Sequence, residues 1–203
     1  MTLSIVSIVE GHAETESIRV LLTRILESMQ RFDVAVARPF RVKRNRVVRP
    51  GELERAVQQA VSDRADPGGV LVLLDADDDC PATLGPALLE RCRGVTRLPS
   101  AVVLANKEFE GWFLGSKESL RGVRGIRQDA LAPPAPEGIK GAKELLSRNM
   151  MAGRRYVAVD DQAALARRMD LEMARGRCPS FDKFLRDVDT LVSQLGGGPQ
   201  LDP

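Results

Sequence analysis

Histidine, cysteine and aromatic residues are scarce in this chain. Its 203 residues include 1 histidine and 3 cysteines, and aromatic residues make up 4%. The cysteines (Cys80, Cys92 and Cys178) form no Cys-x-x-Cys pair, and His12 stands alone. Because zinc sites use histidine and clustered cysteine ligands, a zinc protein is not expected. An odd number of scattered cysteines is typical of reduced thiols rather than of a disulfide framework.

Long apolar runs and targeting signals are also missing. No segment approaches the roughly 18 apolar residues that a membrane span requires, and the first residues lack the basic start of a secretory signal. The GxxxxGK[ST] loop of P-loop ATPases is absent. The 30 basic and 28 acidic residues nearly balance, so polyanion binding must rest on a local patch. We therefore expect a cytoplasmic protein without membrane contact.

Residues 1–114 show alternating strand and helix patterns. Short β-branched or apolar runs predict strands at 5–9, 33–40, 70–74 and 100–105. Between them, apolar residues recur at the spacing of one helix face, and Asp66-Pro67-Gly68-Gly69 predicts a turn before the third strand. Strands separated by helices pair in parallel, with helices on both faces of the sheet. We therefore predict an α/β fold with a Rossmann-like sheet of about four parallel strands.

The rest of the chain has a different composition. Residues 115–139 have few apolar periodicities and end in a proline-rich turn, which predicts a long loop. Helices are expected near 140–151 and 161–175, followed by a last helix with a continuous apolar stripe. Residues 140–195 are thus predicted to form a helical C-terminal appendage packed on the α/β part, and residues 196–203 a frayed tail.

Carboxylates follow two of the predicted strands. In "VLVLLDADDDCP" an apolar run leads directly to Asp75, and Glu10 follows the first strand. If these strands are neighbours, the two carboxylates converge across one inter-strand spacing of about 5 Å. In an extended chain Asp77 and Asp79 would project to the same side as Asp75, and Asp78 to the other. Such a cluster needs a counter-charge, and all-oxygen ligands suit Mg²⁺ or Mn²⁺.

A capping role is the alternative for these acidic residues. Asp79 precedes Pro81, which is typical of the start of a helix. Glu14, in the same way, lies where an acidic residue favours a helix N-terminus.

Two motifs resemble the Toprim signature of topoisomerases, bacterial primases and several nucleases. "VEGHAE" after the first strand matches its Glu-Gly turn, and "LLDADDD" after the third matches its Asp-x-Asp pair. Glycine would allow a sharp turn there. The chain also resembles, over nearly its whole length, a compact stand-alone branch of Toprim-like proteins. Members of that branch share "DADDDCP", "EFEGWFL" and a late "CPSF" helix, and some are encoded beside ATPases in phage-defence loci.

The resemblance implies roles for particular residues. Asp75 and Asp77 would hold Mg²⁺, and Glu10 would serve as a metal ligand or as a general acid and base. Glu14 would match a second metal-binding glutamate of the nuclease branch, and Asp79 would assist.

The nuclease branch also uses a downstream glutamate and a lysine. Glu110 in "KEFEGW" is the preferred glutamate, with Glu108 second, and Lys140 in "GIKGAK" is the candidate catalytic lysine. As alternatives, the two glutamates would merely flank a helix with an aromatic core, and Lys140 and Lys143 would start a solvated helix.

A basic stretch, "RPFRVKRNRVVR", contains no acidic residue. Arg41, Lys43, Arg44 and Arg46 within it would bind a nucleic-acid backbone, because each neutralised phosphate releases counterions. With Phe40 as the only aromatic residue, base-specific reading is not indicated. The alternative is a solvated, irregular extension of the second strand.

The resemblance, together with the carboxylates, implies a Mg²⁺-dependent nuclease that acts on DNA or RNA, as the effector of an ATPase-partnered defence system. Topoisomerase activity is not expected, since Tyr156 is the only tyrosine, and primases need a zinc module that is absent. Haloacid-dehalogenase phosphatases carry their nucleophilic aspartate after the first strand, where this chain has Glu10. The alternative function is a non-catalytic, metal-stabilised regulatory or interaction subunit of an ATPase complex.

Overall fold

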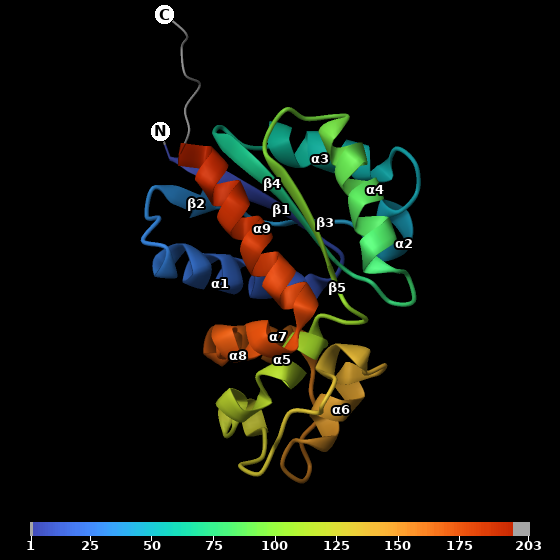
Figure 1. Ribbon diagram of the computed structural model, residues 1–203, viewed down its shortest axis with the longest axis vertical. Coiled ribbons are helices and arrows are strands. Elements are labelled where there is room, and N and C mark those ends of the chain that lie inside the picture. The colour runs from blue at the N-terminus through green and yellow to red at the C-terminus, as the bar shows by residue number, and fades with distance from the viewer. Residues whose placement is uncertain (1, 197–203) are drawn as a thin grey trace, which may run out of the picture.

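The fold is built on one parallel sheet. The computed structural model of this chain describes residues 2–196 and shows an α/β architecture, which confirms the predicted class. The strand order is β2-β1-β4-β5, and β3 also pairs with β1 (Figure 1). The strands are β1 (Leu3–Val9), β2 (Val34–Val36), β3 (Phe40–Arg41), β4 (Pro67–Asp75) and β5 (Ser100–Ala105).

The expected second strand is divided into β2 and β3. Pro39 lies between them and has no N–H group, so it cannot continue the ladder of hydrogen bonds along β1. The described part of the chain thus has five strands where about four were predicted.

Helices cover both faces of the sheet. Those packed against it are α1 (His12–Ser28), α3 (Glu52–Ser62), α4 (Pro81–Arg93) and α9 (Pro179–Gly196), and α2 (Arg44–Val47) precedes α3. Because side chains alternate along a strand, Ile5 and Val9 of β1 face the core under α1 and α9. Val6 and Ile8 face the core under α3 and α4 (Figure 1).

The helical part lies beyond the end of the sheet at which β5 leads into α5 (Figure 1). Its helices are α5 (Glu110–Gly115), α6 (Ala142–Arg148), α7 (Ala158–Arg168) and α8 (Leu171–Arg177), and α9 then returns along the sheet. The single helix expected at 161–175 is wrong: Asp170 separates α7 from α8 and accepts a hydrogen bond from the Met173 N–H at 2.8 Å.

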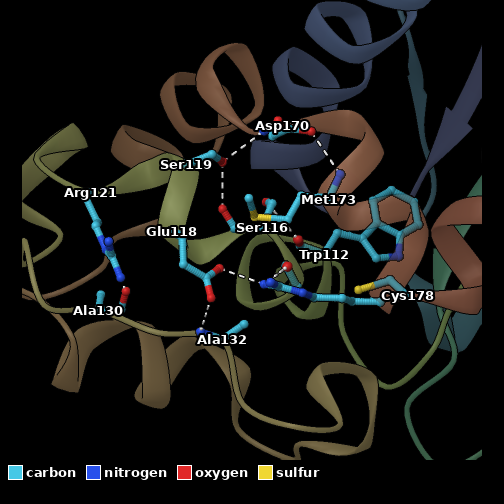
Figure 2. A network of polar contacts seen from close by, with 12 residues as sticks. Trp112, Ser116, Glu118, Ser119, Arg121, Ala130, Ala132, Asp170, Met173 and Cys178 are labelled. Carbon is cyan, nitrogen blue, oxygen red and sulfur yellow. Dashed lines mark hydrogen bonds and ion pairs between the residues drawn. The ribbon is translucent and has the colours of Figure 1, made fainter.

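Residues 115–139 contain three short 3₁₀ helices, η1 (Lys117–Leu120), η2 (Val123–Gly125) and η3 (Pro136–Gly138), joined by loops. Figure 2 shows the hydrogen bonds between η1 and nearby segments of the same chain. The Ser119 hydroxyl accepts from the Asp170 N–H at 2.9 Å, and Glu118 accepts from Arg177 at 2.6 Å and from the Ala132 N–H at 3.2 Å. Polar contacts therefore hold η1 against both ends of α8, at Asp170 and at Arg177.

Two glycines expected in a turn belong to β4. Leu191 of α9 lies so close to Gly69 that an added Cβ would be 2.9 Å from its Cδ1 atom, and at Gly68 an added Cβ would be 2.8 Å from the Leu3 Cβ. Glycine here permits the close approach of α9 to the sheet rather than a turn.

Within residues 2–196, no helix combines the length and apolarity needed to cross a membrane. Apart from Gly196, where α9 ends, the tail predicted at 196–203 lies outside the described residues.

We expect Gly69→Ala to lower the free energy of unfolding by about 1–3 kcal/mol, because the methyl group meets Leu191 and the Pro99 carbonyl oxygen. Urea unfolding followed by circular dichroism measures this. The matched control is Gly176→Ala on α8, where an added Cβ has no neighbour within 4 Å; alanine there should raise stability by about 0.5–1 kcal/mol. Unchanged stability of Gly69→Ala would contradict the close packing of α9.

Candidate functional site

The strands β1 and β4 are neighbours, with Val9 paired to Leu73. The chain leaves β1 toward β2 on one side, while β4 and β5 lie on the other, so the β1–β4 pair marks the topological switch point of the sheet. Ligands of open α/β sheets bind outside the carboxyl ends of the strands at this point. Glu10 follows β1 and Asp75 ends β4, which brings both to that position.

Asp75 contacts the start of the helical part at Phe109, the N-cap of α5. Its side chain is buried, and Oδ1 accepts a hydrogen bond from the Phe109 N–H at 2.7 Å. Burial, followed by repulsion from Glu10 and Glu110, raises the pKa of Asp75 well above its usual range. The positive charge of Lys143 lowers the pKa of Asp75, but it offsets only part of this rise.

Glu10 is half-buried next to this carboxylate. Burial raises its pKa to about 7, and repulsion from Glu14 and Asp77 adds to the shift, while Arg44 opposes it. A carboxyl group that titrates near neutral pH is suited to exchanging protons in a reaction.

Glu14, on the first turn of α1, is buried and folds back over Gly11. A Cβ added at Gly11 would lie 1.7 Å from the Glu14 Oε2 atom. The backbone of Gly11 is ordinary extended chain, with φ −101° and ψ 166°. The chain does bend at Glu10 and Gly11, as expected. Any residue could adopt the Gly11 dihedral angles, so glycine is needed here because it makes room for the Glu14 carboxylate.

Glu110 begins α5 and is fully buried. Its Oε1 atom accepts from the Tyr156 hydroxyl at 2.9 Å and from Gln162 Nε2 at 3.2 Å, and Oε2 lies 3.7 Å from Lys143 Nζ. Burial raises the pKa of Glu110 although Lys143 and Tyr156 lower it. For Lys143, burial lowers the pKa, but Glu110 and Asp75 outweigh it and the net shift is upward.

Three carboxylate oxygens of this site have no hydrogen-bond partner although they are buried: Oε2 of Glu10, of Glu14 and of Glu110. Buried polar atoms rarely lack a partner, and carboxylate oxygens are the ligands that Mg²⁺ and Mn²⁺ prefer. In residues 2–196, no three acidic, histidine or cysteine side chains already surround a common point as a metal site does. The donor set fits a hard cation, and the carboxylates would have to move closer together to share one.

The loop after β4 departs from the predicted geometry. Asp77 is exposed, has a left-handed φ of 52°, and donates its N–H to the Lys107 carbonyl at 3.0 Å. The chain is thus not extended here, and the expectation that Asp75, Asp77 and Asp79 project to one side on that basis is wrong. Asp79 does not cap α4 either: the N-cap is Cys80, and Asp79 pairs with Arg44.

Glu108 and the two lysines of "GIKGAK" occupy different places near the site. Glu108 accepts from the N–H groups of Gly141 at 2.8 Å and Ala142 at 3.1 Å, and so caps α6 rather than joining the carboxylates. Lys143 lies on this capped helix and pairs with Glu110. Lys140 precedes the helix, is exposed and pairs with Asp78.

The basic stretch forms β3, α2 and the chain around them. Arg41 pairs with Val9 across the sheet, so the stretch runs beside Glu10. Arg44 donates from Nε to the Asp75 carbonyl at 2.9 Å, in addition to its contact with Asp79, and Arg46 pairs with Glu52 at 2.7 Å. Arg41 and Lys43 are exposed and form no ion pair within residues 2–196.

Tyr156 and Gln162 are site residues that no sequence motif indicated. Gln162 lies on the buried stripe of α7 together with Asp161, Leu165 and Ala166. A polar residue beside apolar ones at helical spacing is the one signal that could have pointed to it.

The fold and the site define an α/β protein with buried carboxylates at the switch point of its sheet. Residues 9–189 match the family model described as Domain of unknown function (DUF4276), and the chain belongs to this family. The match begins at Val9 and includes the site residues from Glu10 to Gln162. Comparisons with the curated proteins and with the solved structures gave no match.

In EDTA, we expect the free energy of unfolding to fall as pH rises from about 4.5 through about 7. Over this range folded Glu10 keeps a proton that the unfolded glutamate has lost, so raising the pH favours unfolding. Asp75 and Glu110 act in the same direction. Glu10→Gln removes the contribution of Glu10, and urea unfolding near pH 5 and near pH 8 should show a smaller difference than in the wild type. Identical differences would contradict the raised pKa.

Proposed function

We propose that the protein is a Mg²⁺-dependent nuclease of the Toprim type that hydrolyses phosphodiester bonds of DNA or RNA. The observation that carries the proposal is the set of three buried carboxylate oxygens without a hydrogen bond, from Glu10, Glu14 and Glu110, at the switch point of the sheet. The "VEGHAE" and "DADDDCP" motifs supply Glu10 and Asp75 at this position and support the Toprim assignment.

Glu10, Glu14, Asp75, Asp77 and Glu110 are the residues that would hold the cation. Mg²⁺ or Mn²⁺ bound there would polarise a phosphoryl oxygen and lower the pKa of water. Asp79 contributes less, because Arg44 already pairs with it.

The protein's own groups supply the remaining chemistry. Glu10 is half-buried at the switch point and would exchange a proton with the attacking water or the leaving oxygen. Lys143 is partly exposed and lies beside Glu110, so its ammonium group neutralises charge that develops on the phosphate. We assign it the role that sequence motifs gave to Lys140.

A nucleic-acid backbone is the proposed binding partner. The basic stretch lines a groove of about 290 Å³, in which Arg46 and Arg55 pair with Glu52. Arg41 and Lys43 line the same groove and are exposed beside β1, which Glu10 follows. Each phosphate that they neutralise adds salt-dependent affinity. Arg44 is largely buried and contacts the loop after β4, so it orders the site more than it binds nucleic acid. The resemblance to proteins encoded beside ATPases adds an ATPase partner in phage defence to this proposal.

We expect the wild type to cleave DNA or RNA in the presence of Mg²⁺ or Mn²⁺, and Lys143→Met to lower the rate by about 10²–10³-fold through lost charge stabilisation. Lys140→Met is the matched comparison, three residues away on the same segment, and should lower the rate far less. Cleavage of labelled single- and double-stranded substrates measures both.

Equal losses in the two lysine variants would contradict the assignment of Lys143. If the wild type cleaves neither DNA nor RNA with either metal, the nuclease proposal fails and the non-catalytic regulatory role becomes the better one.

A further inference from the structure

We infer that Gln162 is a positioning residue that turns one oxygen of Glu14 and one oxygen of Glu110 toward a shared cation. The inference rests on the proposed function, because it concerns the same site. It assigns a role to a residue outside every sequence motif of the site and explains why an amide, rather than a charged group, occupies this position.

One buried amide group spans two carboxylates. Gln162 lies on α7 and is fully buried, and its Nε2 donates to Oε1 of Glu14 at 3.3 Å and to Oε1 of Glu110 at 3.2 Å. The two glutamates belong to α1 and α5, so the contact joins the α/β part to the helical part. Arg24 of α1 donates to the Ala166 carbonyl at 2.6 Å and fastens α7 in this place.

The two carboxylates determine which way the amide points, and Ser17 satisfies its oxygen. Its hydroxyl lies 2.8 Å from Gln162 Oε1 and 3.0 Å from the Ala13 carbonyl oxygen, and it has one proton to donate. Ionised carboxylates only accept hydrogen bonds, so the NH₂ group of Gln162 must face Glu14 and Glu110. The amide oxygen therefore faces Ser17 and takes the proton of its hydroxyl.

This arrangement divides each carboxylate into an engaged and a free oxygen. Oε1 of Glu14 is bound by Gln162, and Oε1 of Glu110 is bound by Gln162 and Tyr156. The Oε2 atoms of both glutamates are buried and accept no hydrogen bond, although Oε2 of Glu110 lies 3.7 Å from Lys143 Nζ. These two oxygens are the ones that we assign to the cation.

The chemistry of the amide suits this task. An arginine or lysine at position 162 would form ion pairs with both glutamates and cancel the charge that attracts a cation. Glutamine orients the carboxylates by hydrogen bonds and leaves their negative charge intact. Hydrogen-bond partners of metal-binding carboxylates typically change metal affinity by about 10–100-fold when they are removed.

The test is calorimetric titration of Mn²⁺ into the wild type and Gln162→Leu, with circular dichroism as the check of folding. We expect the Mn²⁺ affinity of Gln162→Leu to fall by about 10–100-fold. The matched control is Gln58→Leu on the exposed surface of α3, which should bind Mn²⁺ as the wild type does.

Ser17→Ala is the second variant, and it decides the question if Gln162→Leu does not fold. It keeps Gln162 but removes the donor to its oxygen, so the amide is held by its two carboxylate contacts alone. The affinity should therefore fall in the same direction by a smaller factor. The inference is overturned if Gln162→Leu binds Mn²⁺ with wild-type affinity. If Gln162→Leu does not fold, wild-type affinity of Ser17→Ala overturns it. Either result leaves the proposed function intact. If the wild type itself binds no Mn²⁺, the proposed metal site fails and the inference fails with it.

Discussion

Repulsion between buried carboxylates is the constraint on which the rest of this structure depends. Burial, and after it repulsion within the cluster, raises the pKa values of Glu10, Asp75 and Glu110. Placing a charge in the protein interior costs several kcal/mol, and the partly exposed Lys143 offsets only part of that cost. Ion-pair networks can also shift pKa values, but here three buried oxygens accept no hydrogen bond, and Lys143 lies near only one of them. A bound cation is the simplest counter-charge for such a site.

The helical part completes the site rather than adding a separate unit. The α/β part supplies Glu10, Glu14 and Asp75, whereas Glu110, Lys143 and Gln162 come from α5, α6 and α7. The contact of Gln162 with both glutamates crosses from one part to the other. Binding a cation would therefore stabilise the docking of the helical part as well as the site itself.

Local sequence patterns predicted the α/β class, the strand ends and the position of Glu10 and Asp75, because apolar periodicity and strand ends are local properties. What they could not predict depends on contacts between distant segments. Glycine is needed at position 69 of β4 because α9 packs closely over it. Glycine is needed at position 11 because Glu14 folds back over it. Lys140 and Lys143 are three residues apart in one motif, and the cap that Glu108 provides to α6 decides which of them reaches Glu110. No sequence pattern near Gln162 predicts its contacts with Glu14 and Glu110, which lie far from it in the sequence.

The most direct measurement is the thermal unfolding of the wild type and Glu110→Gln, with and without Mg²⁺, at mildly alkaline pH. The account predicts that Mg²⁺ raises the unfolding temperature of the wild type. Glu110→Gln should unfold at the same or a higher temperature than the wild type in EDTA, because one repulsive charge is gone, and should respond less to Mg²⁺. The account is contradicted if Mg²⁺ leaves the wild type unchanged, or if Glu110→Gln is less stable in EDTA and responds to Mg²⁺ as the wild type does.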